Sequence, residues 1–220
     1  MRIMGVDLSL ACTGLSLPNG TTAAVKPKSK GDQRLKEITD RVWTNAYGVD
    51  LVVIEGLGGR YLGEASRVIP MLHGALRLKL MEDGIPYMLL SPSSLKKFAT
   101  GSGTADKTAM ALAALKRLGR EYKTSDECDA DWLRIAGRFA YGLGEHLGGG
   151  RVLQMPQENL KALRWSLSKK EPIVWPVVGG REPWPTVELR EPLRGPMVQH
   201  APGVAVLCTS CAARGQTICS

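Results

Sequence analysis

The sequence predicts an α/β domain with a mixed central sheet, in which three antiparallel strands are followed by parallel strands and helices flank the sheet. Turn-rich segments at 11–14 and 18–20 divide the first 25 residues into short strand-like runs. The runs at 51–55 and 86–90 are almost continuously apolar, which is typical of buried parallel strands. Segments with helical spacing of apolar residues separate these runs, so the chain alternates strands with helices.

Each predicted element has a local signal. Strands are expected at 2–9, 15–17 and 21–25, because apolar and β-branched residues fill the stretches between turns. The remaining elements are, in chain order, a helix at 31–47, a strand at 51–55, a helix at 66–81, a strand at 86–90, a helix capped by 91–93, and helices at 105–118 and 126–142. Gly101-Ser102-Gly103 separates the helix that begins near Pro92 from the next one.

The composition favours a soluble protein with a polyanionic partner. Lys and Arg outnumber Asp and Glu by 29 to 21, which gives a net charge of +8. No long apolar leader opens the chain, and no run approaches the ~20 apolar residues of a membrane span. Five scattered cysteines favour a reducing compartment over a disulfide scaffold. We therefore expect a cytoplasmic protein that does not bind membranes.

The character of the chain changes at Gly148-Gly149-Gly150. Eight of the thirteen prolines lie beyond this point, where nine Lys or Arg residues accompany five Asp or Glu residues. We expect a folded domain at 1–147 and a basic, Gly/Pro-rich extension at 148–220 that is partly disordered, with one helix at 158–168.

Zinc binding by the extension is a weaker alternative. Cys208 and Cys211 form one C-x₂-C pair, and Cys219 and His200 lie near them in sequence. One such pair is half of a zinc finger, and the other spacings fit no common pattern. A loose tail with reduced thiols is the favoured interpretation.

Four acidic residues in three distant segments are candidates for one site. Asp7 interrupts an apolar strand and Glu55 ends another, where a charge is costly unless it is paired or binds a metal. Asp126 and Asp129 are three residues apart at a helix start, so they share a face, although Asp126 could instead be an N-cap. Oxygen ligands of this kind suit a hard cation such as Mg²⁺.

These segments resemble those of the RuvC-type Holliday junction resolvases, especially the phage-type crossover junction endodeoxyribonucleases, within the ribonuclease-H-like superfamily. The matching segments are 5–9 (GVDLS) with Thr13-Gly14, 53–56 (VIEG), 72–77 (LHGALR), 91–107 (SPSSLKKFATGSGTADK) and 126–130 (DECDA). They occur in the family's order over about residues 2–142. Two positions depart from the family: Cys128 replaces a small residue, and Asp131 stands where an apolar residue is usual. Asp131 should point elsewhere on the helix and not ligate metal.

The resemblance implies a ribonuclease-H-like fold and metal-dependent hydrolysis of DNA at four-way junctions, in the host cytoplasm if the protein is phage-encoded. Asp7 would bridge two Mg²⁺ ions, with Glu55 on one side and Asp126 and Asp129 on the other, and Mn²⁺ as a possible substitute. All four acids are thus the implied catalytic residues.

The resemblance also implies how the protein meets DNA. Lys96 and Lys107 match family lysines near the scissile strand, and Lys97 is a further candidate for DNA contact, although a solvated helix face would also explain Lys96 and Lys97. A homodimer is expected, because a four-way junction has near two-fold symmetry. The helix at 66–81 has more apolar residues than one face requires, which suggests that it packs partly against its mate: Val68, Met71, Leu72, Ala75 and Leu76.

Three other functions remain open. An actin-like ATPase also opens with a Gly-x-Asp strand, but this chain is short for its two-domain body. A protein that binds branched DNA without cutting it would have little use for four costly acids. A nuclease of the same fold that acts on forks or flaps is compatible with every residue pattern above.

Overall fold

The computed structural model describes residues 1–58 and 65–163, and its centre is one five-stranded mixed sheet. The strands are β1 (Ile3–Asp7), β2 (Thr13–Ser16), β3 (Thr22–Val25), β4 (Leu51–Glu55) and β5 (Tyr87–Leu90). Their order across the sheet is β3-β2-β1-β4-β5. The pairs β1–β2 and β2–β3 are antiparallel, whereas β1–β4 and β4–β5 are parallel. The predicted mixed sheet is therefore confirmed.

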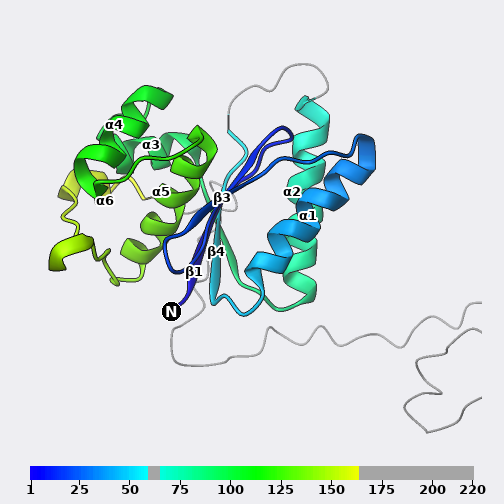
Figure 1. The fold of residues 1–220 in the computed structure, drawn as a ribbon, viewed down its shortest axis with the longest axis horizontal. Helices are drawn as coiled ribbons and strands as arrows, with labels where there is room; N and C mark the ends of the chain where they lie inside the picture. Colours follow the sequence, from blue (N-terminus) through cyan, green and yellow to red (C-terminus); the bar gives the residue numbers. More distant parts are fainter. Residues whose placement is uncertain (59–64, 164–220) are drawn as a thin grey trace, which may run out of the picture. The chain divides into compact units, whose positions relative to one another are not determined.

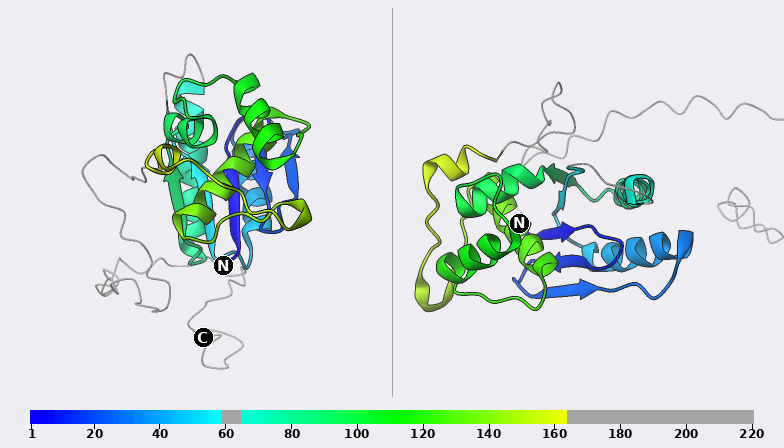
Figure 2. Two further views of the ribbon diagram at one scale, coloured as in Figure 1. Left: turned by 90° about the vertical axis from the view of Figure 1, so that its left-hand side faces the viewer. Right: turned by 90° about the horizontal axis from the view of Figure 1, so that it is seen from above.

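Helices cover both faces of the sheet (Figure 1). The helices are α1 (Gly31–Ala46), α2 (Ala65–Glu82), α3 (Pro92–Thr100), α4 (Lys107–Leu118), α5 (Ser125–Ala140) and α6 (Gln157–Leu160), with a 3₁₀ turn at Gly148–Gly150. Helices α1 and α2 lie on one face, and α3, α4 and α5 lie on the other (Figures 1 and 2). Within the described residues, no helix has the length and apolar character needed to span a bilayer.

Alternation along the strands divides the apolar side chains between two cores. Met4 and Val6 of β1 belong to the cluster that includes Ile38 of α1 and Leu72 of α2. Ile3 belongs to the opposite cluster, with α3, α4 and α5. Because side chains alternate along a strand, Asp7 points to the same face as Ile3, which is the face that α5 covers.

Helix α5 lies directly against the backbones of β1 and β2, because both strands have glycine at the contact. A Cβ atom added to Gly5 would stand 2.0 Å from the carbonyl oxygen of Ala130. One added to Gly14 would stand 1.9 Å from the carbonyl oxygen of Asp126. These contacts bring the first turns of α5 beside the end of β1, where Asp7 is located.

The chain continues to pack against the core after residue 147, where the sequence analysis placed the end of the domain. Leu153 and Met155 are buried in the α5-side cluster. The side chain of Asn159 donates a hydrogen bond of 2.8 Å to the carbonyl oxygen of Phe98, so α6 lies against α3 (Figure 2, yellow). Two isolated apolar residues and one asparagine make these contacts, so this part of the sequence shows no hydrophobic periodicity.

Residues 164–220 lie outside the described part of the chain. The predicted partial disorder of the extension, the last five residues of the predicted helix at 158–168, and the zinc alternative at His200, Cys208, Cys211 and Cys219 fall in whole or in part within them. In the described part, the helix ends at Leu160, earlier than predicted.

Candidate metal centre

Two of the four predicted acids stand side by side at one end of the sheet. Asp7 ends β1 and Glu55 ends β4, and these parallel strands are paired through Val6 and Ile54, the preceding residues. Asp7 is only 8% exposed, and it lies close enough to Glu55 for the charge of Glu55 to raise its pKa. The carboxyl ends of two neighbouring parallel strands thus deliver both acids to one point.

The start of α5 delivers the other two acids. Its N-cap is Thr124, whose Oγ1 accepts a hydrogen bond from the backbone N–H of Glu127, while the Glu127 side chain accepts one from the N–H of Thr124. This capping box satisfies the helix terminus. Asp126 is therefore not the N-cap, which the sequence had left open, and both Asp126 and Asp129 act electrostatically on Asp7.

Burial and mutual repulsion favour proton uptake by this cluster. Burial raises the pKa of Asp7 well above its usual range, and the charges of Glu55, Asp129 and Asp126 raise it further. Burial likewise raises the pKa of Glu55 to about 7, with Asp129 adding to the effect and Lys96 opposing it. Burial raises the pKa of Asp129 to about 6, against the opposing charge of Lys107. Clustered acids with raised pKa values are typical of functional sites.

The donor set fits a hard divalent cation. All four side chains offer carboxylate oxygens, and Oδ1 of Asp129 is buried with no hydrogen-bond partner in the structure. A buried, unpartnered carboxylate oxygen is costly, and a cation would satisfy it. Within the described residues, no three His, Cys, Asp or Glu side chains already stand at ligand spacing.

Two of the three predicted lysines act on this cluster. Lys107, the first residue of α4, donates a hydrogen bond of 2.9 Å to the Ser125 hydroxyl, and its charge opposes the raised pKa values of Asp7 and Asp129. The charge of Lys96, in α3, opposes the raised pKa values of Glu55 and Asp129. Both cations therefore lie near the carboxylates.

Lys97 is placed differently. It is exposed and lines a surface hollow between α3 and α6 together with Ser93, Ser94 and Lys161. The charges of Lys96 and Lys107 act on the carboxylates of the cluster. Lys97 therefore lines a neighbouring surface, and no pattern in the sequence indicates that Lys161 would join it there.

Cys12 is a neighbour of the site that sequence reasoning missed. It lies in the turn between β1 and β2, close enough to Asp126 for the charge of that carboxylate to act on its thiol. Burial raises the pKa of Cys12, and the Asp126 charge raises it further, so the thiol stays protonated. A half-buried cysteine in a short turn carries no sequence signal, because only the approach of α5 places an acid beside it.

Neutralising one acid is expected to stabilise the metal-free protein at pH 8. The pKa of Glu55 is about 7 in the fold against 4.5 ordinarily, so the folded state binds more protons and stability falls as pH rises between these values. Glu55→Gln should raise the free energy of unfolding by about 1–2 kcal/mol at pH 8, and the gain should vanish near pH 4.

Denaturant unfolding in EDTA at both pH values measures this gain. Glu121→Gln, which changes an exposed acid outside the cluster, is the control and should have no effect. Equal stability of wild type and Glu55→Gln at pH 8 would contradict the repulsion.

No family model matches the chain, but individual relatives do. Crossover junction endodeoxyribonuclease RuvC of Corynebacterium efficiens is 33% identical over 147 residues, which cover 59% of this chain and 65% of that protein. RuvC of Corynebacterium diphtheriae is 33% identical over 144 residues, covering 58% of this chain and 87% of that protein. RuvC of Gloeobacter violaceus is 30% identical over 149 residues, covering 62% and 86%.

The fold has a solved counterpart. The structure of Thermus thermophilus RuvC in complex with Holliday junction substrate matches with a TM-score of 0.53 at 22% identity, over 65% of this chain and 97% of that one. The alignments span about two thirds of the Corynebacterium efficiens and Corynebacterium glutamicum proteins, at 65% and 66%, and most of the Corynebacterium diphtheriae protein. Relatives of this identity and coverage, together with the shared fold, show that the chain belongs to the RuvC family of crossover junction endodeoxyribonucleases.

Proposed function

We propose that this protein is a structure-selective endonuclease that resolves four-way DNA junctions by Mg²⁺-dependent phosphodiester hydrolysis. One observation carries the proposal: acids from β1, β4 and α5 meet in a single half-buried cluster, with Lys96 and Lys107 beside it. The names of the relatives and the junction bound to Thermus thermophilus RuvC support the choice of substrate.

The chain's own residues have distinct roles in this proposal. Asp7, Glu55, Asp126 and Asp129 would hold two Mg²⁺ ions, or Mn²⁺ in their place. When bound, such ions lower the pKa of water and stabilise charge on the leaving oxygen. The carboxylates would fix the position of the ions relative to the protein. Lys96 and Lys107 offer positive charge to the non-bridging oxygens of the scissile strand.

A panel of labelled substrates tests the proposal. The protein with Mg²⁺ should cut a four-way junction on two opposed strands and leave linear duplex intact. Faster cutting of flaps or forks would instead favour the alternative of a nuclease for other branched DNA. Tight binding to the junction without cutting in Mg²⁺ or Mn²⁺ would favour a protein that only recognises DNA structure.

Removing the two lysines is expected to weaken DNA binding in a salt-dependent way. Each phosphate that a lysine neutralises contributes about −0.9 to the slope of log affinity against log salt concentration. Lys96→Ala with Lys107→Ala should therefore make the slope shallower by about 2 and slow cleavage. Lys36→Ala, which changes an exposed lysine of α1, is the control. An unchanged slope and rate in the double variant would remove both lysines from the interface.

A homodimer would place two such sites on one junction, and α2 offers a surface for it. Leu72 and Leu76 are buried against the sheet, so these two of the residues named from sequence belong to the protomer's own core. Met71 and Leu78 are 54% and 58% exposed, and Ala75 between them is also exposed. These three residues lie on one side of the helix, and this side would pack against the second protomer.

Charge on this side of α2 is expected to separate the protomers. Leu78→Glu should convert a dimer to a monomer in sedimentation at micromolar concentration and abolish paired nicking, because a buried unpaired carboxylate is costly. Leu112→Glu changes a leucine of α4 that is 47% exposed and should leave the dimer intact. A wild-type protein that is monomeric and still makes paired nicks would contradict the dimer.

A further inference from the structure

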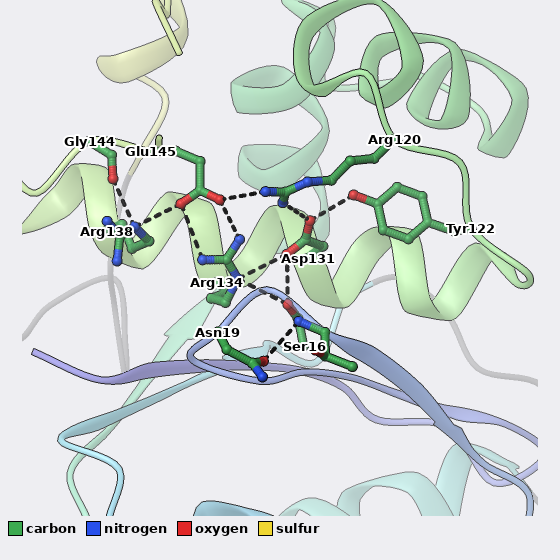
Figure 3. Close-up of polar contacts among 10 residues, drawn as sticks. Ser16, Asn19, Arg120, Tyr122, Asp131, Arg134, Arg138, Gly144 and Glu145 are labelled. Atoms are coloured by element: carbon green, nitrogen blue, oxygen red, sulfur yellow. Dashed lines mark hydrogen bonds and ion pairs between the residues drawn. The ribbon is translucent and has the colours of Figure 1, made fainter. Parts of the chain in front are cut away.

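A buried acid that the metal centre does not use lies two residues beyond Asp129. Asp131 has no exposed surface, and its carboxylate accepts four hydrogen bonds (Figure 3). Oδ1 accepts from the Ser16 hydroxyl at 2.6 Å and from Nε of Arg134 at 2.9 Å. Oδ2 accepts from Nη1 of Arg120 at 2.6 Å and from the Tyr122 hydroxyl at 2.7 Å. Asp131 thus points away from the cluster, as expected, and is fully paired.

A second acid extends the network beyond α5. Glu145 is 4% exposed and accepts hydrogen bonds from Arg134 at 2.6 Å and from Arg120 at 3.0 Å. It is also paired with Nε of Arg138 at 2.8 Å. The network therefore joins β2, the segment between α4 and α5, helix α5 itself, and the chain that follows α5 (Figure 3).

The position of α5 decides whether two of the carboxylates reach Asp7. The glycine contacts at Gly5 and Gly14 set how closely the helix approaches the sheet. These contacts alone do not set its rotation, because they limit how closely the helix approaches and not which way it turns. Each residue turns a helix by about 100°, so a shift of one position would carry Asp126 and Asp129 away from the end of β1.

Hydrogen bonds add a directional restraint to the apolar packing of α5. Apolar burial is non-directional, whereas a hydrogen bond weakens steeply as its angle departs from linear. The bonds from Ser16 of β2 to Asp131, and from Arg134 back to Ser16 at 3.0 Å, tie α5 to a fixed point of the sheet. Buried ion pairs add little to stability by themselves, and their better-attested use is to specify one arrangement.

We propose that Asp131 is a positioning residue, which holds α5 in the register that lets Asp126 and Asp129 share in binding the divalent cation. The inference rests on the proposed function, because it assumes that these two acids are ligands. Asp131 thereby has a role, although it stands where the resemblance predicts an apolar residue.

Mn²⁺ binding to the full-length protein without DNA tests this role. Asp131→Asn keeps the shape of the side chain but removes the charge that pairs with Arg134 and Arg120. Loss of residues that orient ligands typically weakens metal binding about 10- to 100-fold, and we expect that loss here. Ser16→Ala removes only the hydrogen bonds from β2, so it should also weaken Mn²⁺ binding. This variant is less prone to unfold than Asp131→Asn.

The matched control separates positioning from stability. Leu76→Ala destabilises the opposite core without touching α5, so the folded variant should bind Mn²⁺ as wild type does. All affinities are measured at a temperature where circular dichroism shows each variant folded. Wild-type affinity in both folded Asp131→Asn and Ser16→Ala would overturn the positioning role alone. A wild-type protein that binds no Mn²⁺ would overturn the metal centre itself, and the inference with it.

Discussion

Asp7→Asn is expected to lower Mg²⁺-dependent cleavage of a four-way junction at least about 10³-fold, because it removes the acid that the other three surround. Asp7 is the one carboxylate whose pKa is raised by all three of the others. Asn retains the shape and some hydrogen bonding, but an amide cannot supply the negative charge that a divalent cation requires. Glu55→Gln and Asp129→Asn should act in the same direction.

Single-turnover cleavage and junction binding, measured separately, check this expectation. Binding should stay within about twofold of wild type, because phosphate contacts from lysines dominate affinity. Asp50→Asn is the control, since Asp50 pairs with Arg2 just before β4, at the opposite end of the strand from Glu55. Wild-type cleavage by Asp7→Asn protein would remove Asp7 from the site.

Gly5→Ala is expected to destabilise the fold by about 3 kcal/mol or more. The added methyl would lie 2.0 Å from the carbonyl oxygen of Ala130 and 2.6 Å from the backbone nitrogen of Arg134. Both are backbone atoms, so the clash cannot be relieved by rotating a side chain, and α5 must move away from β1. Metal binding should weaken with it, since α5 carries Asp126 and Asp129.

Denaturant unfolding measures this loss. Gly148→Ala is the control, because a Cβ there meets nothing within 4 Å, and it should leave stability unchanged. Wild-type stability of Gly5→Ala would mean that α5 is not held against β1 in solution.

Local signals were enough to predict most of the fold. Apolar runs bounded by turns gave all five strands, and the runs at 51–55 and 86–90 form the parallel pair β4–β5. The helix at 92–100 ends at Gly101, which adopts a left-handed φ of 93° where a glycine is favoured. The boundary after 147 was less predictable, because Leu153, Met155 and Asn159 attach the following chain by single contacts.

The candidate site was only partly predictable for a physical reason. Asp7 and Glu55 stand out because a charge in an apolar strand is unusual, and the spacing of Asp126 and Asp129 places them on one face. The network around Asp131 could not be predicted from the sequence. Ser16 is 115 residues away in sequence, and Glu145 lies in an irregular segment. Only the tertiary fold brings such groups together.

Anomalous scattering from crystals grown with Mn²⁺ would show directly whether the four carboxylates bind metal. We expect Mn²⁺ beside Asp7 and Glu55, with Asp126 and Asp129 completing the protein ligands, and loss of those peaks in Asp7→Asn crystals. Well-ordered Mn²⁺ elsewhere on the protein, with the four carboxylates free of metal, would contradict the assignment of this cluster as the metal centre.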